Sequence, residues 1–117
     1  MEFDRFTVAL LITNPDGPSL TEAEEFALQE AHMAHLADLH DAGHLIAAGP
    51  LRDEPDRHYR GLSILNVDAA TALELKSQDP AVRAGRFVVK VIPWMVPGGA
   101  IGYTHTRFPR TIAEAND

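Results

Sequence analysis

The order of the predicted secondary-structure elements constrains the fold of this chain more than any other feature. Apolar runs rich in Val, Ile, Leu and Phe predict strands, and segments with helical spacing of apolar residues lie between them. The predicted order is strand, helix, strand, strand, helix, strand, over residues 6–13, 22–42, 44–48, 61–67, 69–78 and 87–95. This β-α-β-β-α-β order is typical of an α+β, ferredoxin-like fold, with two helices on one face of a four-stranded antiparallel sheet.

Capping residues support the boundaries of the two predicted helices. Thr21 and Glu24 have the spacing of a capping box at the start of the first helix. Gly43 is the residue type at which such a helix commonly ends, and Asp68 can cap the second helix. Pro93 falls near the end of the last strand and predicts a sheet edge or a bend there, because proline cannot donate to a strand ladder.

Apolar residues occur on both faces of the predicted strands. In the first strand, Phe6 and Val8 share one face while Ala9 and Leu11 share the other. Two helices cover only one face of such a sheet, and an uncovered apolar face forgoes about 25 cal/mol per Å² of burial. We therefore expect a homodimer in which two sheets pack face to face, usually with two-fold symmetry. The alternative is that the C-terminal tail folds back over the sheet.

The chain of 117 residues is long enough for one domain, which we place at residues 1–96. The remaining residues, 97–117, form a C-terminal extension that begins with the flexible sequence Pro97-Gly98-Gly99. We expect a short strand around 101–108. The extension could cover a pocket, exchange with a partner, or be mobile.

Composition excludes several classes of function. The net charge is −7 and no basic block occurs, so neither nucleic acid nor an anionic membrane is an expected partner. The chain has no cysteine, which removes thiolate catalysis and Cys-based metal sites and fits a reducing cytoplasm. The N-terminal apolar run is too short to span a bilayer and lacks the features of a signal peptide. We expect a cytoplasmic protein.

His32 is the first candidate for chemistry, because it lies in the apolar stripe of the first predicted helix. At 100° per residue, this stripe contains Phe26, Leu28, His32, Met33, Leu36, Ala37 and Leu39. A titratable ring among apolar side chains needs a hydrogen-bond partner or a function. An ordinary histidine pKa of about 6.5 suits a general acid or base at neutral pH. The alternative is a buried structural histidine that hydrogen-bonds to the backbone.

Asp79 is the second candidate. It ends the second predicted helix ahead of Pro80, and its side chain could simply accept hydrogen bonds from nearby backbone N–H groups. In the predicted topology, however, the two helices lie side by side on one sheet face. A carboxylate from the second helix could then reach His32, orient the ring and raise its basicity.

Other polar residues are weaker candidates. The predicted substrate-binding residues are Gly49, Pro50, Arg52 and Ser63, with Arg83, Arg86 and Tyr59 as further candidates to hold an anion or donate a hydrogen bond. Four further histidines are weaker candidates. His40 and His44 interact favourably with the C-terminal end of the helix dipole, and His58 and His105 are expected to be solvated. No ligand spacing typical of a metal site and no nucleotide-binding glycine motif occurs, so we expect neither a metal nor a cofactor.

Several short segments together resemble the YciI-like (YCII-related domain) family. They comprise His32 with Leu36 and Leu39, the run from Asp41 through Gly43 and Leu45 to Ala48-Gly49-Pro50-Leu51, Gly61-Leu62-Ser63-Ile64, Asp79-Pro80, Ala84-Gly85, and Pro93-Trp94. The resemblance covers residues 6–95 and implies a dimeric α/β barrel with a site centred on a histidine and an aspartate, which correspond to His32 and Asp79. The implied fold is similar to that of muconolactone isomerases, and some family members are dehydrochlorinases of hydroxylated aromatic compounds.

These observations predict a small cofactor-free enzyme. His32 would move a proton at a carbon next to a carbonyl group and Asp79 would orient its ring, giving isomerisation or elimination on a small cyclic or aromatic metabolite. One alternative is a non-catalytic dimeric module that binds a small molecule or regulates a partner. Another is a purely structural dimer in which the histidine is a core residue.

Overall fold

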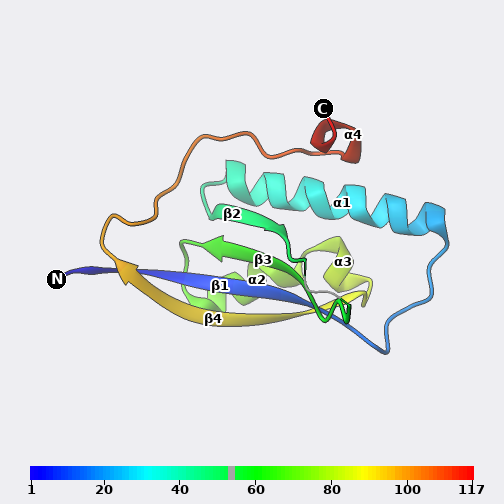
Figure 1. The fold of residues 1–117 in the computed structure, drawn as a ribbon, viewed down its shortest axis with the longest axis horizontal. Helices are drawn as coiled ribbons and strands as arrows, with labels where there is room; N and C mark the ends of the chain where they lie inside the picture. Colours follow the sequence, from blue (N-terminus) through cyan, green and yellow to red (C-terminus); the bar gives the residue numbers. More distant parts are fainter. Residues whose placement is uncertain (53–54) are drawn as a thin grey trace.

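A computed structural model describes residues 1–52 and 55–117, and it has the expected ferredoxin-like architecture (Figure 1). Its elements are β1 (Phe3–Thr13), α1 (Glu22–Asp41), β2 (Leu45–Pro50), β3 (Tyr59–Leu65), α2 (Ala69–Ser77), α3 (Pro80–Arg83), β4 (Phe87–Pro97) and α4 (Ile112–Ala115). The strands form one antiparallel sheet in the order β2-β3-β1-β4. One core cluster contains residues from α1, α2 and three strands, so both long helices pack on the same sheet face.

The predicted helix caps are confirmed. The Thr21 hydroxyl accepts the Glu24 N–H at 3.1 Å, and the Glu24 carboxylate accepts the Thr21 N–H at 3.1 Å. Asp68 accepts the N–H of Thr71 at 2.8 Å at the start of α2. Gly43 has φ +87° just beyond α1, in the left-handed region that glycine adopts without strain.

Several of the predicted strands were too short. β1 and β4 pair along their whole lengths, from Phe3 opposite Pro97 to Thr13 opposite Phe87, so the ladder extends beyond the apolar runs. β3 begins at Tyr59 rather than 61, because this residue pairs with Ile12 across an irregularity in the register. The segment between the second predicted helix and the last predicted strand contains the short helix α3. Residues 53–54 lie outside the described residues.

The two faces of the sheet differ in their coverage. The face under the helices contains a core of Ala9, Leu45 and Leu65, each with 0% exposure. The opposite face bears Val88, Ile92 and Trp94 from β4, which are 47%, 39% and 39% exposed. β4 is an edge strand, as the position of Pro93 predicted. The helices therefore leave a second apolar surface on the sheet.

The C-terminal tail does not form the predicted strand and does not cover the open face of the sheet. The strand predicted around 101–108 is wrong, since this segment has no regular structure, and the tail ends in α4. Figure 1 shows the tail passing the end of β2 and then running beside α1, rather than spreading across the open sheet face. Near the start of the tail, Ile101 packs against a core cluster of Phe6, Ile46 and Val96. The physical reason is that polar and aromatic groups of the tail find hydrogen-bond and stacking partners on α1.

Candidate active site

His32 and Asp79 are held together by a short hydrogen bond. His32 lies in the middle of α1, and Asp79 is the N-cap residue of α3. Their side chains meet with Nδ1 of His32 2.6 Å from Oδ2 of Asp79. Because a carboxylate only accepts, Nδ1 carries the hydrogen and donates it. Among the described residues, no hydrogen bond holds the other ring nitrogen, Nε2, and the ring borders a pocket.

The surroundings of Asp79 favour its charged form. Burial by itself raises the pKa of this carboxyl, because the side chain is completely inaccessible to solvent. The hydrogen bond and charge of His32, the N–H of Ala81 at 2.9 Å and the nearby Lys76 outweigh that effect and hold the pKa below its ordinary value. Asp79 thus both caps α3, as one sequence interpretation proposed, and reaches His32.

Two further titratable side chains surround the same carboxylate. Nδ1 of His35 lies 3.9 Å from Oδ2 of Asp79, one helical turn from His32, and this buried atom has no hydrogen-bond partner among the described residues. Burial lowers the pKa of His35, and the charges of Lys76 and His32 add to that effect while Asp79 opposes it. The fully buried Lys76 lies 4.0 Å from Asp79 and donates to the Ser63 hydroxyl at 3.3 Å. Its pKa is lowered by burial, and Asp79 counteracts this.

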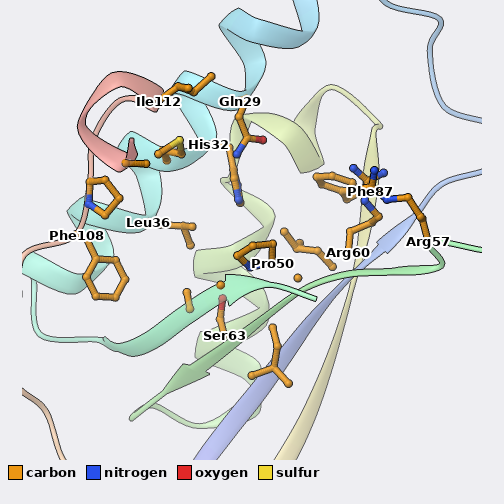
Figure 2. A pocket seen from close by; sticks show the side chains of 18 residues that line it. Gln29, His32, Leu36, Pro50, Arg57, Arg60, Ser63, Phe87, Phe108 and Ile112 are labelled. Carbon is orange, nitrogen blue, oxygen red and sulfur yellow. The ribbon is translucent and has the colours of Figure 1, made fainter. Parts of the chain in front are cut away.

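The pocket beside His32 has a volume of about 560 Å³, which is within the usual range for a small-molecule site. Its walls come from α1, β2, β3 and the tail. Figure 2 shows the ring of His32 projecting into the pocket above Pro50, with Ser63 below. Leu36, Phe108 and Ile112 lie toward one end, and Phe87 lies toward the other. The arrangement therefore places one polar ring in a mainly apolar cavity.

The tail wall of the pocket is anchored on His40. This buried ring stacks on Phe108 with centroids 4.1 Å apart and on Tyr103 at 4.8 Å. Its Nδ1 and Nε2 lie 2.7 Å and 2.8 Å from the carbonyl oxygens of Leu45 and Thr106. His40 thus connects α1, β2 and the tail, a role beyond the helix-dipole interaction that the sequence predicted.

Arginine side chains lie at the other end of the pocket. Arg57 and Arg60 line it beside Phe87 (Figure 2). The guanidinium carbons of Arg60 and Arg86 each lie 5.4 Å from the centroid of the Phe87 ring. Burial lowers the pKa of Arg60, and the charges of Arg57 and Arg86 lower it further while Glu25 opposes the change.

The predicted ligand-binding residues divide into two groups. Gly49, Pro50 and Ser63 line the pocket. Arg52 and Arg83 are exposed and lie outside its lining, so the structure does not place these two in the site. Arg86 is paired with Glu25 at 3.3 Å, outside this pocket, and Tyr59 is also outside its lining.

The sequence analysis missed the pocket residue Arg57 because no periodicity orders the segment before β3. It missed Arg60 because β3 begins two residues earlier than predicted and so contains this arginine. It also missed Lys76, although this lysine is three residues before Asp79 and so shares its end of the helix. In the part of the chain that the structure describes, no three His, Asp or Glu side chains form a possible metal-ligand group.

The YCII-related domain matches residues 7–95, which is most of the chain and contains both His32 and Asp79. The protein belongs to the YCII-related family. No curated protein matches its sequence. A similar solved structure is the 5-chloro-2-hydroxyhydroquinone dehydrochlorinase of Burkholderia phenoliruptrix in complex with 2,5-dihydroxybenzoquinone. It is 18% identical, with a TM-score of 0.54 over 76% of this chain and 92% of that one, which establishes a shared fold.

Part of the pocket wall comes from residues that the matched domain does not include. Residues 96–117 lie beyond the matched domain, yet Phe108, Pro109, Ile112 and Ala115 line the pocket.

None of the described helices is long and apolar enough to cross a membrane.

Proposed function

We propose that this protein is a small acid/base enzyme that transfers a proton next to a carbonyl group, giving isomerisation or elimination on a small cyclic or aromatic metabolite without a cofactor. The observation that carries the proposal is the 2.6 Å hydrogen bond between His32 and Asp79 at the wall of the pocket. A base oriented by a second group is the usual arrangement for such proton transfer. The dehydrochlorinase of the same fold, solved with a quinone, supports a ring-shaped ligand.

In the proposed reaction His32 acts as the base. Its Nδ1–H remains with Asp79, so Nε2 presents a lone pair to the substrate. When Nε2 takes the proton, the electrons of the broken C–H bond form a carbon–carbon double bond, and the carbonyl oxygen becomes an enolate. Isomerisation ends when His32 returns the proton to a different carbon. In elimination the enolate electrons instead expel a leaving group such as chloride, and His32 releases its proton to water.

Ser63 is proposed to assist at the opposite wall of the pocket. Its hydroxyl oxygen accepts a hydrogen bond from Lys76 at 3.3 Å, which leaves its own hydrogen for donation to a ligand. A donor placed at the substrate oxygen stabilises an enolate more than it stabilises the starting carbonyl, and so lowers the barrier. Gly49 and Pro50 are proposed to complete the wall against which the ring packs.

Deuterium exchange tests the proton-transfer step without requiring the full reaction. In D₂O, the wild-type protein should catalyse incorporation of deuterium next to the carbonyl group of compounds in a panel of cyclic ketones and hydroxylated quinones. His32→Ala should reduce the exchange rate by about 10²- to 10⁴-fold, as expected for loss of a general base. His44→Ala is the matched control, because His44 does not line the pocket, and it should exchange at the wild-type rate. Equal rates for His32→Ala and the wild type would show that His32 is not the base.

We also propose that two copies of the chain associate through the open face of the sheet. Val88, Ile92 and Trp94 make this face apolar, and it lies on the opposite side of the sheet from the helices. Burying such a surface against an identical copy is favourable, and a two-fold axis satisfies both copies at once.

A further inference from the structure

We propose that Arg57 and Arg60 form a subsite for a carboxylate group, so that the ligand of this pocket is a ring compound bearing a negative charge at one end. The subsite deepens the proposed function, since it specifies the class of substrate that would be presented to His32. It is carried by the positions of the two guanidinium groups, the strained backbone of Arg57 and the apolar surface at the other end of the pocket.

The position of Arg60 is determined by Phe87. Its guanidinium carbon lies 5.4 Å from the centroid of this buried ring, and Arg86 lies at the same distance. Contact with a ring face orients a guanidinium group and leaves its N–H groups at the edge for other partners. Arg60 thus presents a planar fork of donors, a shape that matches the two oxygens of a carboxylate.

No ion pair within the described part of the chain ties Arg57 or Arg60 to a carboxylate, although the charge of Glu25 acts on Arg60. Arg86 pairs with Glu25 at 3.3 Å, and this pair lies outside the pocket. Within residues 1–52 and 55–117, neither guanidinium group of Arg57 and Arg60 makes a hydrogen bond or an ion pair. The charge of Arg57 acts on Arg60 and lowers its pKa, so the two groups repel one another. An anion bound there would relieve their mutual repulsion.

The backbone of Arg57 is strained. Its φ of +51° lies in the left-handed region, and Arg57 is the one non-glycine residue with positive φ in the described ranges. Thr13 at the end of β1 holds this conformation, since its hydroxyl donates to the Arg57 carbonyl oxygen at 2.7 Å and its N–H donates to the His58 carbonyl oxygen at 2.9 Å. Strain that is maintained at the rim of a pocket is typical of functional positions.

The opposite end of the pocket determines the rest of the ligand. Leu36, Phe108 and Ile112 form an apolar surface there, and His32 lies between this surface and the arginines (Figure 2). A ligand with its carboxylate at Arg57 and Arg60 would place its ring beside His32 and its apolar part against the tail. The pocket therefore favours an aromatic or cyclic acid over a neutral ring of the same size.

Binding of a matched pair of probes tests this subsite. The probes are 2,5-dihydroxybenzoate and its neutral counterpart 2,5-dihydroxybenzamide, and the dissociation constants are measured by calorimetry at two salt concentrations. The wild-type protein should bind the acid about 10- to 100-fold more tightly than the amide, the range expected for charged hydrogen bonds. This preference should decrease at high salt.

Arginine variants assign the preference to specific side chains. Arg57→Gln and Arg60→Gln should each reduce affinity for the acid and leave affinity for the amide nearly unchanged, while Arg60→Lys should restore part of the loss. Arg5→Gln makes the same charge change on an exposed residue outside the pocket, and it should retain the wild-type preference. If the acid fails to bind, if the two probes bind equally, or if Arg5→Gln has the same effect as the pocket variants, the carboxylate subsite is wrong.

The outcome also separates this inference from the proposed reaction. His32→Ala should keep the preference for the acid, because the subsite does not use the histidine. A retained preference without catalysed deuterium exchange would leave the subsite in place and contradict the enzyme. Catalysed exchange on neutral rings at a rate that does not depend on Arg57 or Arg60 would support the enzyme and contradict the subsite.

Discussion

The ammonium group of Lys76 lies 4.0 Å from the carboxylate of Asp79, and neither side chain is accessible to solvent. The two charges compensate one another where water cannot, and a buried charge that loses its partner is costly. Asp79 is therefore a shared partner of a lysine behind it and of His32 at the pocket wall.

Replacing Lys76 tests this compensation. Lys76→Met removes a positive charge that lowers the pKa of Asp79, so this pKa should rise. Asp79 with a lowered pKa stabilises the fold above its unfolded-state pKa of about 3.9, and this stability is lost as pH falls through the folded-state pKa. The acid limb of the stability curve should thus move to higher pH. Arg5→Met, which removes a positive charge from an exposed residue outside this cluster, is the control, and identical curves for both variants would contradict the coupling.

Asp79→Asn separates orientation of the His32 ring from capping of α3. The asparagine oxygen can still accept the Ala81 N–H, so α3 should remain capped. Its amide, however, can donate to Nδ1 of His32 and thereby stabilise the tautomer with hydrogen on Nε2, which cannot act as the base. We expect the deuterium-exchange rate to fall by about 10²- to 10⁴-fold.

The control for this substitution is Asp68→Asn at the cap of α2, which is the same chemical change at another helix cap. It should leave exchange unaffected. An unchanged rate in Asp79→Asn would remove the orienting role.

The lowered pKa of His35 predicts that stability depends on pH near neutrality. The folded state favours the neutral ring, so His35 contributes stability that is complete above its unfolded-state pKa of about 6.5 and is lost as pH falls through the lower folded-state pKa. Denaturation midpoints measured from about pH 8 to about pH 5 should decrease. His35→Leu should reduce the decrease, whereas the same substitution at the exposed His105 should not. A curve for His35→Leu parallel to that of the wild type would contradict the prediction.

The tail should control binding at the apolar end of the pocket. Phe108→Ala removes both the stacking on His40 and part of the pocket wall, and we expect affinity for an aromatic ligand to fall about 10-fold. Hydrogen exchange of the Ile112 amide, which donates to Glu30 at 2.6 Å, should accelerate as the tail loosens. Arg110→Gln is the control. It breaks exposed ion pairs with Asp38 and Asp41, which contribute little to stability, so its effects should be smaller. Equal effects of the two substitutions would show that surface charge, rather than stacking, holds the tail.

Self-association through the open sheet face predicts sensitivity to a buried charge. Ile92→Lys should dissociate the homodimer, because the lysine would be placed in the apolar interface. Leu73→Lys makes the same kind of change at a similarly exposed residue of α2, away from this face, and should leave the dimer intact. Sedimentation velocity measures both, and a monomeric wild-type protein would contradict the proposal.

Local signals in the sequence were sufficient for most of the fold. Alternating apolar residues, the cap residues Thr21 and Asp68, and Gly43 identified strands and helix ends, because each of these depends on neighbours along the chain. The topology then brought Asp79 within reach of His32. Its catalytic role, like that of His32, remains a prediction.

The remaining features depend on contacts that local patterns do not encode. Lys76 resembles a surface lysine, and only the packed helix shows it to be buried. Arg57 reaches the pocket through a left-handed turn that no local residue type signalled. Residues 101–108 of the tail were predicted as a strand, whereas their course follows from stacking on His40. His40 lies 63 residues before Tyr103 and accepts a hydrogen bond from its hydroxyl.

The wall formed by the tail lies outside the family domain, whereas the histidine and aspartate lie inside it. One part of the pocket wall and the His32–Asp79 pair are thereby encoded in separate stretches of sequence. Changes near the C-terminus alter the space offered to a ligand without disturbing the paired side chains. A chain that keeps the pair and changes only residues 96–117 would therefore offer a ligand a pocket with a different wall.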